Sequence, residues 1–181
     1  GEISLITTDT PLSGTSSNLK LALAGTINYT GNVTITNSNY TLLELKVINS
    51  ATSGEISLTT SDTPLSGTSS NLELALAGTI NYSGDVTITN SDYTLSKLKN
   101  FISLASQITL NNPEAELSGT VLDFVDVFGK IITTHTGQVI ITDSASVDIQ
   151  ATDITTIDNA STGTITVNNA INIIGSGSEV A

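Results

Sequence analysis

The chain has 181 residues, of which 38% are hydrophobic and only 12% charged, and its formal net charge is −12. All five basic residues are lysines, so no arginine forks or basic patches are present to bind nucleic acid, and we expect no nucleic acid among the partners. There is no cysteine for a disulfide or thiolate metal site, and no apolar run is long enough to span a membrane, so we expect no membrane insertion.

A long internal repeat organises the sequence. Residues 1–53 and 54–106 are identical at 40 of 53 aligned positions, and residues 107–181 continue the pattern in a diverged form. A fixed period of this size indicates a repeat architecture. We therefore expect residues 1–181 to form a single repeat segment, and the start of the chain inside a repeat is typical of a piece of a longer array.

Short strands are predicted after a small residue that recurs seven times. In chain order these small residues are Gly1, Gly31, Gly54, Gly84, Ser106, Gly137 and Gly163. Alternation predicts that two apolar residues of each strand face inward. These pairs are Val33/Ile35, Ile56/Leu58, Val86/Ile88, Ile108/Leu110, Val139/Ile141 and Ile165/Val167. Polar residues that suit a corner close the strands. They are Asn37, Thr60, Asn90, Asn112, Asp143 and Asn169.

A second extended segment and a helix are predicted after each corner. The extended segments begin at Leu12, Tyr40, Leu65, Tyr93, Leu117, Ile149 and Ile173. Apolar residues three or four apart predict short helices near residues 42–51, 95–105, 124–131 and 154–160, with Thr41 and Asp153 as caps for two of them. No helix is predicted after Gly163. Since one such unit cannot bury its apolar residues alone, we expect a β-rich (α/β) solenoid of stacked parallel strands with short helices on one face.

The run YTLLELKVINSATSGEISL and its echo ATDITTIDNASTGTITV resemble the repeat regions of very large secreted proteins of cyanobacteria and other marine bacteria. Those proteins are similar to adhesins and to cell-surface or matrix components. The resemblance implies an extracellular or cell-surface location and a spacer role, and it carries no site residues. The nonapeptide of calcium-binding RTX rolls is absent.

Few residues point to chemistry. His135 is the only histidine and precedes Gly137, which predicts a solvated turn residue rather than a catalytic one. Asp123 and Asp126 are expected on the solvent face of a helix, the alternative being a general acid–base pair. Asp143, Asp148, Asp153 and Asp158 recur every five residues, and stacking would have to bring them together to hold Ca²⁺. We expect no cofactor unless that calcium site exists.

Tyrosines and threonines offer the remaining candidates. Tyr29/Tyr82 and Tyr40/Tyr93 are paired by the repeat, which favours packing between repeats over stacking on sugars. Outward strand positions form two predicted files on one sheet, and they define the candidate binding face. Its residues are Thr34, Thr36, Ser57, Thr59, Thr87, Thr89, Thr109 and Thr166. Strand propensity explains these threonines, and an ice-binding face is the alternative interpretation.

The sequence therefore predicts a structural repeat segment of an extracellular fibre, sheath or adhesin, without enzymatic activity. Its expected partners are copies of itself or adjoining repeats, end to end. The alternative is a ligand-binding solenoid that recognises glycan, calcium or ice on its threonine face. A solenoid polysaccharide lyase or hydrolase is a third hypothesis, disfavoured by the lack of arginine and tryptophan.

Overall fold

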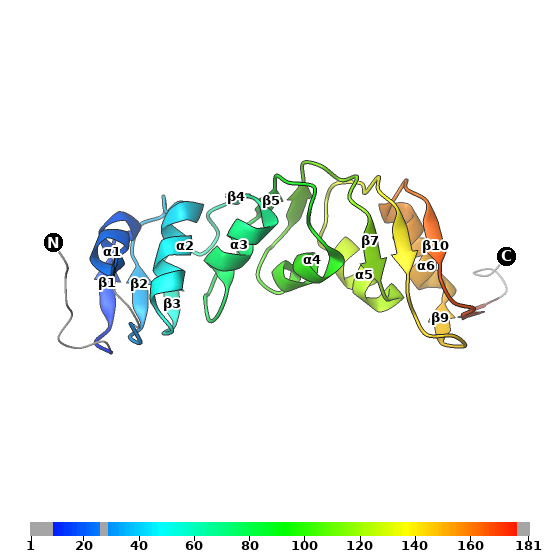
Figure 1. Cartoon of the computed structure of the whole chain (residues 1–181), viewed down its shortest axis with the longest axis horizontal. Coiled ribbons are helices and arrows are strands. Elements are labelled where there is room, and N and C mark those ends of the chain that lie inside the picture. Colours follow the sequence, from blue (N-terminus) through cyan, green and yellow to red (C-terminus); the bar gives the residue numbers. More distant parts are fainter. Residues whose placement is uncertain (1–8, 26–28, 177–181) are drawn as a thin grey trace. The chain divides into compact units, whose positions relative to one another are not determined.

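The computed structural model describes residues 9–25 and 29–176. The fold is α/β, with short parallel strands in several small sheets and six helices in the described part of the chain (Figure 1). The chain divides into two compact units, one of residues 1–87 and 104–106 and the other of residues 88–103 and 107–181.

Three helices and most of the first five strands make up the N-terminal unit. The elements are β1 (Leu12–Gly14), α1 (Ser16–Leu23), β2 (Val33–Ile35), α2 (Leu42–Ala51), β3 (Ile56–Leu58), β4 (Leu65–Gly67), α3 (Ser69–Leu76) and β5 (Val86–Ile88), which ends across the unit boundary. Strands β1, β2 and β3 pair in parallel, with Val33 opposite both Leu12 and Ile56. Helices α1, α2 and α3 lie side by side along the unit.

The C-terminal unit repeats this arrangement with three more helices. Its elements are α4 (Leu95–Ile102), β6 (Ile108–Leu110), β7 (Leu117–Gly119), α5 (Val121–Phe128), β8 (Val139–Ile141), β9 (Asp148–Gln150), α6 (Ala151–Ala160), β10 (Ile165–Val167) and β11 (Asn172–Ile174). Strand β8 pairs in parallel with β7 and β10, and β9 pairs in parallel with β11. Helix α5 contacts both α4 and α6.

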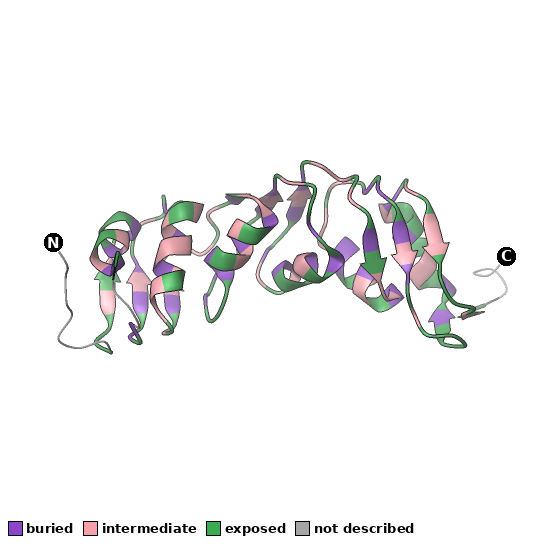
Figure 2. Ribbon diagram, viewed as in Figure 1, coloured by how far each residue is buried: buried purple, intermediate pink, exposed green. Residues whose placement is uncertain are grey.

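The strands predicted after the small residues are confirmed wherever the structure describes them. Six of the seven small residues precede a strand, and the segment after Gly1 lies outside the described residues. The inward pairs are buried between sheet and helices in every strand except β10 (Figure 2). In β10 the prediction is wrong, since Val167 is 43% exposed and Ile165 is half-buried. No described element covers the outer edge of that strand.

The helix predictions are only partly right. Helix α2 spans the predicted residues, whereas α4 ends and α6 begins three residues earlier than predicted, and α5 is shifted by three residues toward the N-terminus. Helices α1 and α3 are absent from the prediction. Both begin after a threonine cap, Thr15 or Thr68, whose side chain accepts a hydrogen bond from the third helical amide. The segments at Tyr40 and Tyr93 are not strands and lead directly into α2 and α4.

One predicted helix cap is confirmed and the other is wrong. Thr41 caps α2 in a reciprocal capping box with Glu44. Asp153 lies inside the first turn of α6, where the carboxylate still faces the positive end of the helix dipole. Gln150 occupies the cap position of α6, and its side chain makes no capping hydrogen bond.

Glycines mark places where one chain segment packs directly on the backbone of the next. A Cβ added at Gly54 would overlap the carbonyl of Gly31, and one added at Gly163 would overlap that of Gly137. Because backbone atoms cannot rotate away as a side chain does, these positions tolerate no side chain without movement of the chain. Among the described residues, no helix has the length and apolarity needed to cross a bilayer.

Candidate functional site

In the N-terminal unit, the threonine face is an ordered surface of hydroxyl groups. Ser13, Thr34 and Ser57 stand opposite one another on β1, β2 and β3, at positions about 4.8 Å apart. Thr34 and Ser57 are half-buried by their neighbours, whereas Thr36 and Thr59 are exposed just beyond the strands. The amides of Thr36 and Thr59 donate to the carbonyls of Gly14 and Ile35, at 3.0 and 2.9 Å. The backbone hydrogen bonds of the sheet therefore continue through Thr36 and Thr59, which form the second file of the face.

The face does not extend over one sheet as predicted, because the strands form several small sheets. Thr87 and Thr109 are half-buried on β5 and β6, and Thr89 is exposed after β5. On the β7–β8–β10 sheet, Ile140 stands between Ser118 and Thr166 and interrupts the hydroxyl file. The Gln138 amide group also donates to the Thr166 hydroxyl, at 3.1 Å. Within the paired strands of the N-terminal unit, β1, β2 and β3 therefore present a file of hydroxyl groups that no apolar residue interrupts.

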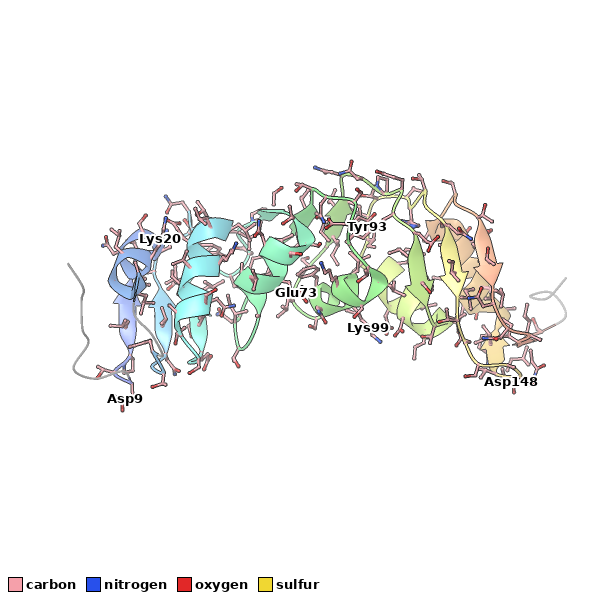
Figure 3. All side chains as sticks on the ribbon, in the orientation of Figure 1. Asp9, Lys20, Glu73, Tyr93, Lys99 and Asp148 are labelled. Atoms are coloured by element: carbon pink, nitrogen blue, oxygen red, sulfur yellow. The ribbon has the colours of Figure 1, made fainter. Side chains whose placement is uncertain are left out.

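Asp123 and Asp126 do not form an acid–base pair. Lys99 projects from α4 and forms an ion pair with Asp123 on α5, while Asp126 is exposed (Figure 3). The hydrogen bond from Lys99 holds the pKa of Asp123 below its ordinary value, although partial burial opposes this. The Asp123 carboxylate is therefore an ionised partner of lysine and links two neighbouring helices.

The four aspartates considered for calcium do not converge. Asp143 accepts a hydrogen bond from the Val121 amide at 2.8 Å, and Asp148 accepts one from Asn172 at 3.0 Å. Asp153 and Asp158 lie in the first and last turns of α6. Within residues 9–25 and 29–176, no group of three or more acidic or histidine side chains could hold a metal ion.

Corner residues bond to the neighbouring segment of the chain. Asn37 Oδ1 accepts a hydrogen bond of 2.7 Å from the first amide of α1, at Ser16, and Asp143 does the same for α5. Glu44 extends the first of these joints because its carboxylate accepts from the hydroxyls of Ser16 and Ser17, at 2.9 and 2.7 Å. Burial opposes ionisation of Glu44, but these hydrogen bonds outweigh it and lower its pKa.

All four tyrosines are buried and bond across the repeat, so none is available to stack on a sugar. Tyr29 donates to the Thr10 carbonyl. Tyr82 is the equivalent tyrosine in the next 53-residue repeat, and it donates to the equivalent carbonyl, that of Thr63. Tyr40 and Tyr93 donate to the carbonyls of Thr60 and Asn112, at 2.8 and 2.7 Å; these bonds join neighbouring segments. Burial raises the pKa of Tyr93 to about 12, so its phenol stays a donor at neutral pH.

His135 is not the solvated turn residue predicted from the sequence. Its side chain is fully buried against Phe128, with 5.7 Å between ring centroids, and neither ring nitrogen has a hydrogen-bond partner. Burial lowers the pKa of His135; the nearby Ala115 carbonyl opposes that effect without reaching hydrogen-bond geometry. The residue occupies the position of Tyr29 and Tyr82, as the matching runs YTGNV, YSGDV and HTGQV show.

A small cleft of about 200 Å³ lies beside this position. It is lined by Phe128, Ile131, Ile132, Thr133, Thr134, Asn159 and Ala160. None of these side chains is acidic or basic, so the cleft offers no acid, base or ionised nucleophile. Comparison with protein-family models, curated proteins and solved structures finds no match to this chain. The joints between repeats and the threonine face are therefore the features of this chain that bear on its function.

Proposed function

We propose that the chain is a solenoid segment of an extracellular fibre, sheath or adhesin, and that its role is structural rather than enzymatic. The supporting observation is the set of joints that tie each segment to the next. Parallel ladders, buried tyrosine hydroxyls and corner side chains all bond forward or backward along the chain. In a stack of this kind each repeat contacts only its neighbours, so these contacts are what hold successive segments together.

The small share of charged residues and the abundance of Ser, Thr and Asn support an extracellular spacer. Cysteine is absent, so the stack holds together without disulfides. The resemblance of the 40–58 run to secreted bacterial repeat proteins agrees with this role. The partners that we propose for the chain are adjoining repeats or further copies of the chain itself.

End-to-end association rests on the exposed edge of the C-terminal unit. In the first sheet, the outer edge of β3 is paired through a parallel bridge between Ile56 and Ile80. By contrast, no described residue pairs with the outer edge of β10. Val167 on β10 and Ile173 on β11 are 43% and 55% exposed. An unpaired apolar strand edge pairs with another strand, and a contact between two different surfaces propagates as a filament.

Sedimentation over a range of concentrations tests this association. The unmodified chain should form larger species as concentration rises, and the Val167→Lys/Ile173→Lys variant should not. Leu122→Lys is the matched control, since Leu122 is 67% exposed but lies on helix α5. A chain that stays monomeric at high concentration, or a control that dissociates the assembly equally, would contradict end-to-end association.

The second candidate function is ligand binding on the threonine face. It is favoured by the register of Ser13, Thr34 and Ser57, which spaces hydroxyls regularly across three strands. Thermal hysteresis and ice-crystal shaping test the ice form of this hypothesis. The structural proposal predicts no activity, whereas activity that Thr34→Lys abolishes would establish the binding function.

A further inference from the structure

One position of the repeat differs between the two units in a way that changes its chemistry. Tyr29 and Tyr82 each place a hydroxyl on a backbone carbonyl, whereas His135 places an imidazole at the corresponding position. Leu117 matches Leu65 at the start of a strand, so Ala115 corresponds to Thr63, whose carbonyl accepts from Tyr82. The histidine ring is shorter than the tyrosine ring and makes no hydrogen bond to that carbonyl.

The surroundings of His135 provide nothing to balance a positive charge. Phe128 of α5 covers the ring, and the backbone of residues 113–115 lies against the following turn. Charged side chains do occur on the elements packed around this position. They are Glu114, Glu116, Asp123, Asp126, Lys130, Asp153 and Asp158. None of them forms an ion pair with the imidazole. Two of the carboxylates, Asp123 and Asp153, are half-buried, and the other four are exposed to solvent.

We propose that His135 is an acid-sensitive joint: protonation of its buried ring releases residues 133–137 from helices α5 and α6 and loosens the C-terminal unit. An unpaired charge is strongly disfavoured in an apolar site, so the protonated ring must reach water. Two backbone hydrogen bonds oppose that movement. They join the His135 amide to Ala160, at 3.0 Å, and the Thr162 amide to the His135 carbonyl, at 2.8 Å. Both break when the segment moves outward.

The direction of the pH effect follows from the burial. The unfolded or opened state has the ordinary histidine pKa of 6.5, and the closed state has a lower one, so the opened state binds the proton more readily. Above pH 6.5 both states are neutral and the joint is fully stable. Stability falls as pH drops below 6.5 and stops falling below the pKa of the closed state. The N-terminal unit has tyrosine at this position, and tyrosine does not titrate in this range.

Amide hydrogen exchange, corrected for intrinsic rates, tests the proposal at pH 7.5 and pH 5.0. Protection of the Thr162 amide should fall at the lower pH through proton linkage, by at most about thirtyfold for an opened state with the ordinary pKa of 6.5. The internal control is the Ser53 amide, which donates to the Tyr29 carbonyl at 2.9 Å in the same geometry. Its protection should not change. The imidazole itself should titrate below pH 6.5 by NMR.

Two variants remove the titrating ring. His135→Tyr restores the residue of the other repeats, and His135→Phe covers the case in which the tyrosine does not fit. In either folded variant, Thr162 protection should be the same at both pH values. A wild-type Thr162 amide that is insensitive to pH, or one whose sensitivity persists in the variants, would overturn the proposal.

Discussion

Asn37 caps helix α1 from the segment that follows it, with its Oδ1 2.7 Å from the Ser16 amide nitrogen. The first amides of a helix have no partner within the helix, and here another segment of the chain supplies one. Asp143 does the same for Val121 at the start of α5. The joint is therefore a recurring connection between neighbouring segments, and it makes the stability of one helix depend on the placement of the next strand.

Asn37→Ala should destabilise the N-terminal unit. It leaves the Ser16 amide without its acceptor, at a cost of about 1–2 kcal/mol in the free energy of unfolding. Urea denaturation measures this loss. Ser38→Ala, at the exposed neighbouring position, is the control and should change the midpoint little. Equal midpoints for the two variants would show that the cap contributes nothing.

Gly54→Ala should destabilise far more than Gly14→Ala. A Cβ at Gly54 overlaps the Gly31 carbonyl, whereas one at Gly14 lies an ordinary 3.8 Å from Leu19 Cγ. We expect a loss of about 1–3 kcal/mol at Gly54, as for overpacking in a core, and little change at Gly14. Thermal unfolding of the two variants measures the difference. Similar melting temperatures would mean that the two segments are not in backbone contact at Gly54.

Val33→Asp should disrupt the N-terminal unit, because the side chain is fully buried and a carboxylate there has no partner. We expect the free energy of unfolding to fall by several kcal/mol. Thr36→Asp introduces the same charge at an exposed position three residues later and is the control. Circular dichroism and urea denaturation report both. A stable Val33→Asp variant would show that this face of β2 is not the buried one.

Glu44 should make the stability of the N-terminal unit depend on pH. The pH range of this effect should be lower than the range in which His135 affects the C-terminal unit. The pKa of Glu44 lies below 4.5 in the folded chain, so its contribution to stability is fully present above pH 4.5 and is lost as pH falls through the folded value. Glu44→Gln should flatten stability against pH below 4.5, as measured by urea midpoints. Glu55→Gln, at an exposed position, is the control. Identical pH profiles in both variants would exclude Glu44 as the source.

Much of this fold could be predicted because its signal is local. A small residue followed by alternating apolar residues identifies each strand, and the repeat shows the same pattern several times. Helices α1 and α3 were missed because SSNLKLAL and SSNLELAL alternate like a strand at their C-terminal ends. In the structure, the spacing of Leu19 and Leu23 places both on the buried helix face.

The candidate site was harder to predict because it depends on register between segments. Asn37 was expected to bond at its own corner, but its partner is Ser16, 21 residues earlier. The position of His135 before Gly137 indicates only a turn residue, and its equivalence to Tyr29 and Tyr82 is absent from the prediction. Alignment of HTGQV with YSGDV would have revealed that equivalence, but the loss of the hydrogen bond to the carbonyl requires coordinates.

Successive segments of the N-terminal unit stack as parallel strands with Val33 opposite Ile56 and Thr34 opposite Ser57. Because the chain has no cysteine, paired cysteines introduced at Thr34 and Ser57 test this register directly. Residues opposite each other on neighbouring strands lie about 4.8 Å apart, which is within the range that a disulfide can bridge. The control is Thr34→Cys/Thr59→Cys, in which both cysteines lie on the same face of the sheet but are not opposite each other. We expect rapid intramolecular oxidation of the first pair and slow oxidation of the second. Equal rates, or faster oxidation of the second pair, would contradict this register.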